Sequence, residues 1–480
     1  MEKKGLSFFT IISTVICVIF VCEACAPAAA IGNQQFFWWI FLIITFLLPY
    51  ALTTAELGTT YESDGGIIDW VREGLGDKWA ARVSYYYWVN DPFWIASLAT
   101  LFPYIMTTIF GFDFESNIWI TLAIELAFTW IVTFMAFSPV ADSEWVLNGG
   151  AIIKVIVAVV VGCVGTWYAT QNGFASDMSA STFLPDLTNT SALGYLSIII
   201  FNFMGFEVIC TMTGDMKDPK AEIPRAIILG GAAIAFIYLF ASFGIGAAIP
   251  ADEIDPDFGM VVALESMVGN GALYKIIALL FLVTMFANMA SWSFGVNSCA
   301  AYAAQTGNMP KVFGKMNPKT GMPDGAALTN GVVTSLILCI QLIPNDFIAN
   351  NIVWMLFGLS VVFLLLTYIP MFPAFLNLRK NDPDRPRFYE FPFKGTMMKV
   401  MLIIPMVELV LTVVATLVPL SADEVADKIP MIIGFVFFLI LGEVLRVHSA
   451  KDRAVEYKGL TPELAAQRLA EEAAAAEAAE

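Results

Sequence analysis

Apolar runs of about twenty residues recur along the whole chain, separated by short polar segments. A helix of that length spans roughly 30 Å, the thickness of the hydrocarbon core of a bilayer. Segment 66–77 is amphipathic and too short to cross, so we expect it to lie along the membrane interface. The pattern predicts twelve spans, at 6–31, 36–60, 81–110, 117–137, 147–169, 191–213, 226–249, 272–304, 326–343, 349–376, 397–419 and 429–447.

The positions of the basic residues predict the orientation of these spans. All of the 25 Lys and Arg residues except Lys275 and Lys428 fall on one side when the chain is threaded back and forth. Segments on the other side are acidic, such as 252–257. Because basic loops are retained in the cytoplasm, we expect a multi-pass protein of the cell membrane with both termini inside.

Composition excludes most other classes of protein. Hydrophobic residues make up 58% of the chain and charged residues 14%, which leaves no room for a soluble domain of any size. We expect one polytopic domain, residues 1–450, followed by a cytoplasmic Ala/Glu-rich tail, 451–480. The single His and the Cys residues inside apolar runs form no metal-ligand pattern, and no phosphate loop or nucleophile motif is present. The sequence therefore predicts no enzyme, cofactor, metal or nucleic-acid partner. Its oligomeric state stays open.

Two lone carboxylates interrupt apolar runs beside helix breakers. Glu23 lies four residues before Pro27 in the first span, and Glu207 lies two residues after Gly205 in the sixth. Ionisable groups at bilayer depth are costly and usually mark a substrate or ion pathway. Broken helices also free backbone groups that can hold a polar ligand. We predict that both acids border a substrate site and that either could carry a proton; the alternative is that they only cap broken helices.

Three further residues are candidates for the same site. Asp91 precedes Pro92 in the third span and is a third pathway acid, unless it is only a kink residue bonded to backbone. Trp292 is predicted to form a wall of the pocket, with small-residue helix packing as the alternative. Lys154, in the fifth span, either extends to the interface or places its ammonium where another transporter holds sodium. A polar stripe accompanies Trp292 at intervals of three or four, formed by Asn288, Ser291, Gly295, Ser298 and Tyr302.

Four stretches of the sequence resemble the amino acid–polyamine–organocation superfamily, most closely its glutamate/γ-aminobutyrate antiporter branch. The sixth-span block, Phe203-Met-Gly-Phe-Glu207 followed by Asp215-Met-Lys-Asp-Pro219, is the most specific. The others are Ala55-Glu-Leu-Gly58 with the segment up to Gly76, Thr182-Phe-Leu-Pro-Asp186, and Ala290-Ser-Trp-Ser293 with the segment up to Pro318. In the first span the chain reads Glu23-Ala-Cys-Ala-Pro27 where many members have a Gly-rich stretch. The likeness therefore supports Glu207 more than Glu23.

The resemblance implies an all-α integral membrane protein with a LeuT-type fold. Its two inverted five-helix repeats would cover about 6–169 and 191–376, with two added helices at about 397–447. It implies alternating access around broken spans one and six, and substrate contacts from Glu23, Cys25, Ala26, Gly205, Phe206 and Glu207. It also matches Lys154 to a lysine of proton-linked members, so Lys154, Glu207 and Glu23 are the predicted coupling residues.

The resulting prediction is a secondary transporter of an amino acid or its decarboxylated amine, working by exchange or with a proton. A polyamine or aromatic-amine carrier of the same fold is the alternative, favoured by the three acids Glu23, Asp91 and Glu207. A channel or receptor-like scaffold is the alternative from another class. A channel needs a continuous polar pore, and one lone acid in each broken span argues against that.

Overall fold

The computed structural model describes residues 6–61, 63, 65–138, 144–188, 196–255, 259–343, 346–419 and 424–456. Every regular element in these ranges is a helix. The last helix, α18, extends to Glu456. The predicted Ala/Glu-rich tail lies outside the described residues from position 457 onward.

The spanning elements follow the predicted apolar runs. They are α1 (Phe8–Ile19) with η1 (Cys22–Ala24) and α2 (Cys25–Ala29), α3 (Gln35–Leu42) with η2 (Ile43–Leu47) and α4 (Leu48–Thr60), α6 (Asp77–Phe110), α7 (Ile118–Met135), α8 (Glu144–Asn172), α10 (Leu196–Phe201) with η4 (Phe206–Asp215), α11 (Pro219–Ala248), α13 (Ala272–Gln305), α14 (Asp324–Leu338) with η7 (Cys339–Leu342), α15 (Asp346–Tyr368) with α16 (Met371–Asn381), α17 (Gly395–Leu417) and α18 (Glu424–Glu456).

The number of spans depends on how broken helices are counted. Among the described residues, ten helices are long and apolar enough to cross a membrane, and the bent pair of α1 with η1–α2 makes eleven. The predicted sixth span is the remaining one. Its described part begins at Leu196 and consists of two short pieces, α10 and η4. Length and composition of the described residues therefore give up to eleven spans, against the twelve predicted.

Short elements lie between the spans. Segment 66–77, predicted to be amphipathic, forms α5 (Ile67–Leu75), which buries its apolar face against α6 and α16. Helix α12 (Gly259–Val268) was not predicted. Its ten residues are too few to span a membrane, and they follow an acidic segment that was predicted to be a loop. The other short turns are η3 (Ala180–Phe183), η5 (Ala251–Glu253) and η6 (Lys311–Gly314).

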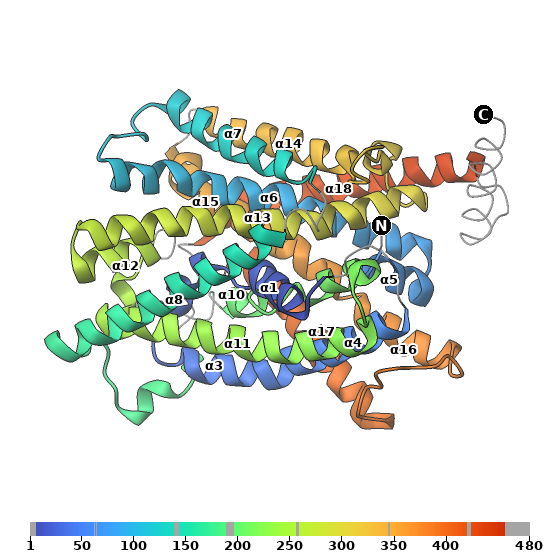
Figure 1. Ribbon diagram of the computed structural model, residues 1–480, viewed down its shortest axis with the longest axis horizontal. Helices are drawn as coiled ribbons and strands as arrows, with labels where there is room; N and C mark the ends of the chain where they lie inside the picture. Colours follow the sequence, from blue (N-terminus) through green and yellow to red (C-terminus); the bar gives the residue numbers. More distant parts are fainter. Residues whose placement is uncertain are drawn as a thin grey trace.

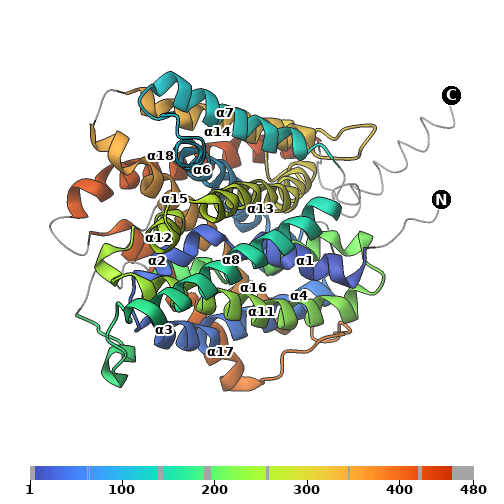
Figure 2. The same cartoon turned by 60° about the vertical axis from the view of Figure 1, so that its left-hand side comes forward.

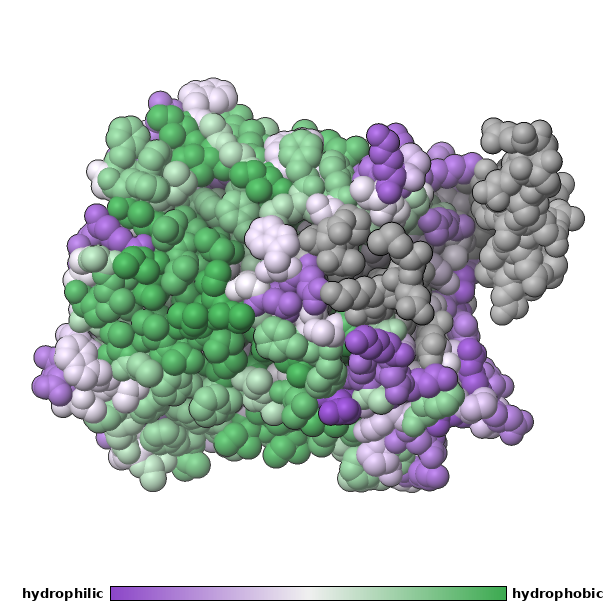
Figure 3. Space-filling view, in the orientation of Figure 1, coloured by the Kyte–Doolittle hydropathy of each residue, from purple (hydrophilic) through white to green (hydrophobic). Residues whose placement is uncertain are grey.

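The helices form two groups that pack along their length. Helices α6, α7, α13 and α14 lie together on one side, and α1, α3, α8 and α11 lie on the other (Figures 1 and 2). On the face seen in Figure 3 a broad apolar area covers most of the molecule, whereas hydrophilic residues gather mainly at the end that carries α5 and α16 in Figure 1. This distribution is typical of a bundle surrounded by lipid. Helix α1 of the second group also contacts α13 of the first, and η4 contacts α11 and α13.

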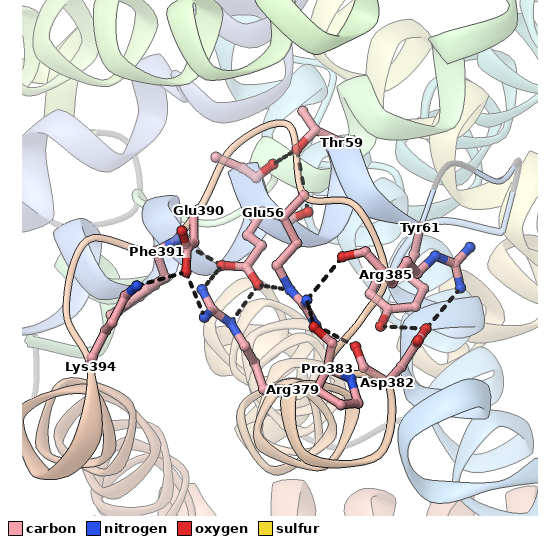
Figure 4. A network of polar contacts seen from close by, with 12 residues as sticks. Glu56, Thr59, Tyr61, Arg379, Asp382, Pro383, Arg385, Glu390, Phe391 and Lys394 are labelled. Carbon is pink, nitrogen blue, oxygen red and sulfur yellow. Dashed lines mark hydrogen bonds and ion pairs between the residues drawn. The ribbon is translucent and has the colours of Figure 1, made fainter.

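An ion-pair network joins α4 to α16 and the segment after it, at the end that carries α5 (Figure 4). Glu56 is 2% exposed and forms ion pairs with Arg379 and, at 3.0 Å, with Arg387. Its carboxylate also accepts the backbone N–H of Phe391 at 2.7 Å. Glu390 lies at the exposed rim of the network, beside Lys394.

Neighbouring basic residues lower the pKa of the Glu390 carboxylate at this rim. A hydrogen bond from Lys394, assisted by the charges of Lys394 and Arg379, holds the pKa of Glu390 below its usual value. Glu390 thus remains ionised to lower pH in the folded protein than in the unfolded chain. The network consists of a buried core around Glu56 and a solvated edge at Glu390.

Candidate transport site

The first spanning element is broken near its middle. Helix α1 ends at Ile19, Phe20 and Val21 adopt extended backbone angles, and the chain resumes as η1 and α2 with a bend of 52°. Extended residues cannot continue the i→i−4 hydrogen bonds, so backbone groups on both sides of the break need other partners. Inside a membrane those partners must come from the protein or a ligand.

Side chains from three other helices satisfy these backbone groups. Lys154 Nζ of α8 donates to the carbonyl of Cys17 at 2.6 Å and to that of Phe20. Asn288 Nδ2 of α13 donates to the same Cys17 carbonyl at 3.0 Å. The Tyr238 hydroxyl of α11 accepts the N–H of Val21 at 2.7 Å and donates to Ile19.

Lys154 therefore acts as a buried cation at the carbonyl end of α1. It is 1% exposed, so it does not extend to the interface as one alternative expected. A positive charge at this position also interacts favourably with the negative end of the α1 dipole. Two of its three N–H donors are bonded to backbone carbonyls, which makes it a weaker partner for a substrate carboxylate than a free ammonium would be.

The second break lies in the sixth spanning element, between α10 and η4. Gly205 has φ +114°, a backbone conformation that residues with a side chain rarely adopt. A Cβ at this position would lie 2.9 Å from Cγ1 of Val18 and 3.2 Å from Cγ1 of Ile19. The two breaks thus pack directly against each other, and glycine is required both for the backbone turn and for the close approach.

Glu207 is held by three tyrosines. The hydroxyl of Tyr87 on α6 donates to its carboxylate at 2.9 Å, and Tyr50 on α4 and Tyr368 on α15 also donate to it. All three rings are at most 1% exposed, as is Glu207. The Tyr50 hydroxyl also accepts the N–H of Gly205 at 3.3 Å. The carboxylate joins the second break to α4, α6 and α15 and has its hydrogen-bonding capacity largely used.

Two small cavities lie beside the first break. The larger, about 40 Å³, is lined by Glu23 and by aromatic rings including Trp94 and Phe357. The smaller, about 10 Å³, is lined by Trp292, Asn90 and other residues. Val21 and Trp94 line both cavities and form the wall between them. One carboxylate oxygen of Glu23 is buried and has no hydrogen-bond partner among the described residues.

The predicted site residues separate into two groups in this structure. Glu23 lines the larger cavity and Trp292 the smaller, where its indole N–H donates to Asn90 at 3.2 Å. Gly205 forms the second break beside Trp292. The remaining predicted substrate contacts, Cys25, Ala26, Asp91, Phe206 and Glu207, line neither cavity.

The reasons differ between these residues. Ala26 packs against Gly259 of α12, a helix that the sequence did not predict. Asp91 faces α13 and α14, where Ser293 and Asn330 contact it. The polar stripe beside Trp292 faces other helices, as expected: Asn288 reaches α1, and Tyr302 donates to Asp69 of α5 at 2.7 Å.

Sequence reasoning missed most of the aromatic side chains at the site. Tyr87, Asn90 and Trp94 recur on α6 at intervals of three and four, so one face of this helix contacts Glu207 and both cavities. That spacing was a usable signal. Tyr50 and Tyr368 had none, because they come from distant parts of a chain that is 14% aromatic.

Comparison with known proteins identifies the family. The sequence model of the amino acid permease family matches residues 6–440. The chain belongs to this family. Among curated members of it, a probable agmatine/putrescine antiporter of Lactococcus lactis is 45% identical, over 92% of this chain and 95% of its own length.

Other permeases are more distant. A cadaverine/lysine antiporter of Escherichia coli is 26% identical, over 74% of this chain and 78% of its own length. A glutamate/γ-aminobutyrate antiporter of L. lactis is 22% identical, over 82% and 80%. The crystal structure of MhsT with L-phenylalanine matches at a TM-score of 0.58 and 15% identity, covering 87% of this chain and 99% of that one.

These findings confirm three predictions. The chain is an amino acid permease with the LeuT-type fold, it is a secondary transporter related to antiporters, and it is not an enzyme. Its relatives include a polyamine-type antiporter and a glutamate/γ-aminobutyrate antiporter. The agmatine/putrescine antiporter is 45% identical to this chain, and the glutamate/γ-aminobutyrate antiporter is 22% identical to it.

Proposed function

We propose that this permease exchanges amine cations, agmatine against putrescine, across the cell membrane. Glu23 is the recognition carboxylate in this scheme. It lines the larger cavity and has a buried oxygen without a partner among the described residues, which is the observation that carries the proposal. A buried acceptor without a partner is costly until a donor reaches it. An ammonium or guanidinium group supplies both the hydrogen bond and the opposite charge.

The surroundings of Glu23 favour a cation over an amino acid carboxylate. Trp94 and Phe357 line the same cavity, and the faces of such rings attract ammonium and guanidinium groups. Lys154, the nearest buried base to the first break, already donates to carbonyls of α1. A substrate carboxylate would therefore have to compete with these carbonyls for Lys154. The agmatine/putrescine relative supports the same substrate class.

Substrate entry requires the two cavities to open. A volume of about 40 Å³ has room for only a few water molecules, since about 10–15 Å³ holds one. An amine of agmatine's length does not fit, so this conformation is closed around the site. Displacement of Val21 and Trp94, which divide the cavities, would join them and bring the substrate between Glu23 and Trp292.

The transport cycle follows from the two breaks. The repeats at about 6–169 and 191–376 alternate the access of the cavity between the two sides, and the termini remain in the cytoplasm. Lys154 takes the place of a metal cation at the end of α1, and proton exchange at Lys154, Glu207 or Glu23 would couple net uptake to pH.

Labelling of single cysteines placed in the 250–257 loop and near Lys394, in intact cells, tests the orientation.

Counterflow in liposomes tests the exchange. Vesicles containing the purified protein and loaded with putrescine should take up labelled agmatine faster than empty vesicles. External putrescine and cadaverine should compete, whereas glutamate should not. Stimulation by internal glutamate or γ-aminobutyrate but not by amines would overturn the proposal of cation exchange.

A matched pair of variants tests the role of Glu23. Glu23→Gln should raise the KM for agmatine by a factor of about 30 or more, because losing one partner of a buried charge pair costs at least about 2 kcal/mol. Glu125→Gln is the control: Glu125 is also a buried acid, 1% exposed, but it contacts Gln341 and lines neither cavity. Equal KM values in the parent and in Glu23→Gln would refute the assignment.

A further inference from the structure

A polar cluster lies inside the bundle, apart from both cavities. It consists of Asp91 on α6, Ser293 and Asn297 on α13, and Asn330 on α14, and we call it the Asp91 cluster. These side chains are between 0% and 2% exposed. None of them lines either cavity, and α6, α13 and α14 lie together in both views of the fold (Figures 1 and 2).

One acceptor oxygen of the cluster has no donor among the described residues. Asn330 Nδ2 lies 2.7 Å from Asp91 Oδ2 and 2.7 Å from Asn297 Oδ1, so both of its hydrogens are used. The carbonyl oxygen of the same Asn330 amide is buried and has no partner among the described residues. The cluster therefore has one buried oxygen to spare, on the amide whose nitrogen contacts Asp91.

The contact between Ser293 and Asp91 is also long for a hydrogen bond. Ser293 Oγ lies 3.3 and 3.5 Å from the two carboxylate oxygens of Asp91, against about 2.7–2.8 Å for a typical O–H···O bond. In the part of the chain that the structure describes, no basic side chain forms an ion pair with Asp91. A buried carboxylate without a cation is strongly disfavoured, so a positive charge is missing from this arrangement.

We propose that the Asp91 cluster binds a sodium ion. Its oxygen ligands are a carboxylate, a hydroxyl and one amide carbonyl, the kinds of oxygen that hard cations bind. One carboxylate charge is balanced by a monovalent rather than a divalent ion. The ligands are Asp91, Ser293 and the free oxygen of Asn330, while Asn297 fixes the orientation of the Asn330 amide. The ion joins α6, α13 and α14, the group of helices opposite the broken α1.

Thermal unfolding of the full-length protein in detergent tests this site independently of transport. At constant ionic strength and neutral pH, sodium chloride should raise the melting temperature saturably by roughly 2–4 °C over choline chloride. Asp91→Asn should abolish this difference. The matched control Glu125→Gln, another buried acid on a neighbouring helix, should retain it.

Two results would overturn the proposal. One is equal melting in sodium and choline; stabilisation by acidification alone would then mean that Asp91 holds a proton instead. The other is an unchanged sodium effect in Asp91→Asn. If that variant does not fold, Ser293→Ala replaces it. The sodium concentration for half of the shift should then rise at least tenfold, and an unchanged midpoint counts equally against the site.

Discussion

Two tyrosines on α6 give a sharp test of how Glu207 is held. Tyr85 and Tyr87 are both 1% exposed and lie two residues apart on one helix. The Tyr87 hydroxyl donates to Glu207 at 2.9 Å, whereas the Tyr85 hydroxyl has no partner among the described residues. Replacing each by Phe removes one oxygen atom from a buried ring. The two variants therefore differ in one respect, the hydrogen bond to a carboxylate.

The expected magnitudes follow from that difference. A hydrogen bond to a charged group contributes about 1.5–3 kcal/mol, so Tyr87→Phe should lower the free energy of unfolding by that amount. Glu207 keeps two phenol donors, Tyr50 and Tyr368, so the loss should not exceed a single bond. Tyr85→Phe removes a buried hydroxyl without a partner and should leave stability unchanged or raise it.

The assay is reversible unfolding by SDS in mixed micelles, followed by tryptophan fluorescence. A double-mutant cycle with Glu207→Gln separates the bond from general effects of the ring. In that background Tyr87→Phe should cost clearly less than in the parent. Equal losses for Tyr85→Phe and Tyr87→Phe, or no coupling to Glu207, would refute the description of this carboxylate as held by phenols.

Two other pairs of variants test the ion network and the second break. Glu56→Gln should destabilise the protein by at most about 3–5 kcal/mol, because it leaves two part-buried arginines without the charge of a buried carboxylate. Glu390→Gln at the exposed rim should change the melting temperature little. Folding lowers the pKa of Glu390, so its small contribution to stability is present above the unfolded pKa of about 4.3 and is lost as the pH falls through the folded pKa. The difference in melting temperature between Glu390→Gln and the parent should therefore shrink on acidification, and a difference that grows would contradict this. Gly205→Ala should abolish exchange and lower the melting temperature more than Gly111→Ala, because both have positive φ but only a Cβ at position 205 meets other atoms; equal shifts of melting temperature would contradict the close packing of the two breaks.

The sequence predicted the fold where one physical signal dominates. Apolar runs of membrane-spanning length appear in the structure as helical elements; the bounds agree closely for 272–304 and Ala272–Gln305 and differ by seven residues at the start of 226–249 and Pro219–Ala248. Helix α12 escaped because its ten residues satisfy neither the length of a span nor the polarity of a loop. The break of the sixth element was signalled by Gly205, since glycine readily takes the positive φ found there.

The site was predictable only in part. Glu23 was conspicuous as a lone charge beside a proline, and it lines the larger cavity. The direction of each side chain was not available from the sequence, because it depends on neighbours from distant segments. Family likeness favoured Glu207 over Glu23, yet Glu207 points to Tyr50, Tyr87 and Tyr368. A matching motif shows only that Glu207 is present at this position. The three phenols that contact its carboxylate come from α4, α6 and α15, far away in the sequence.

The difference between the two glutamates has an energetic consequence for transport. Glu207 already accepts three hydrogen bonds, so a substrate reaching it would first have to displace phenols and would gain little free energy. Glu23 has a buried oxygen with no partner among the described residues, so a cation that reaches it gains a hydrogen bond without breaking one there. Only interactions that differ between the states can drive a conformational change. Substrate binding should therefore act through Glu23 and the first break. Glu207 holds the second break against its neighbours, and the second break should move only when α1, which contacts it at Gly205, moves.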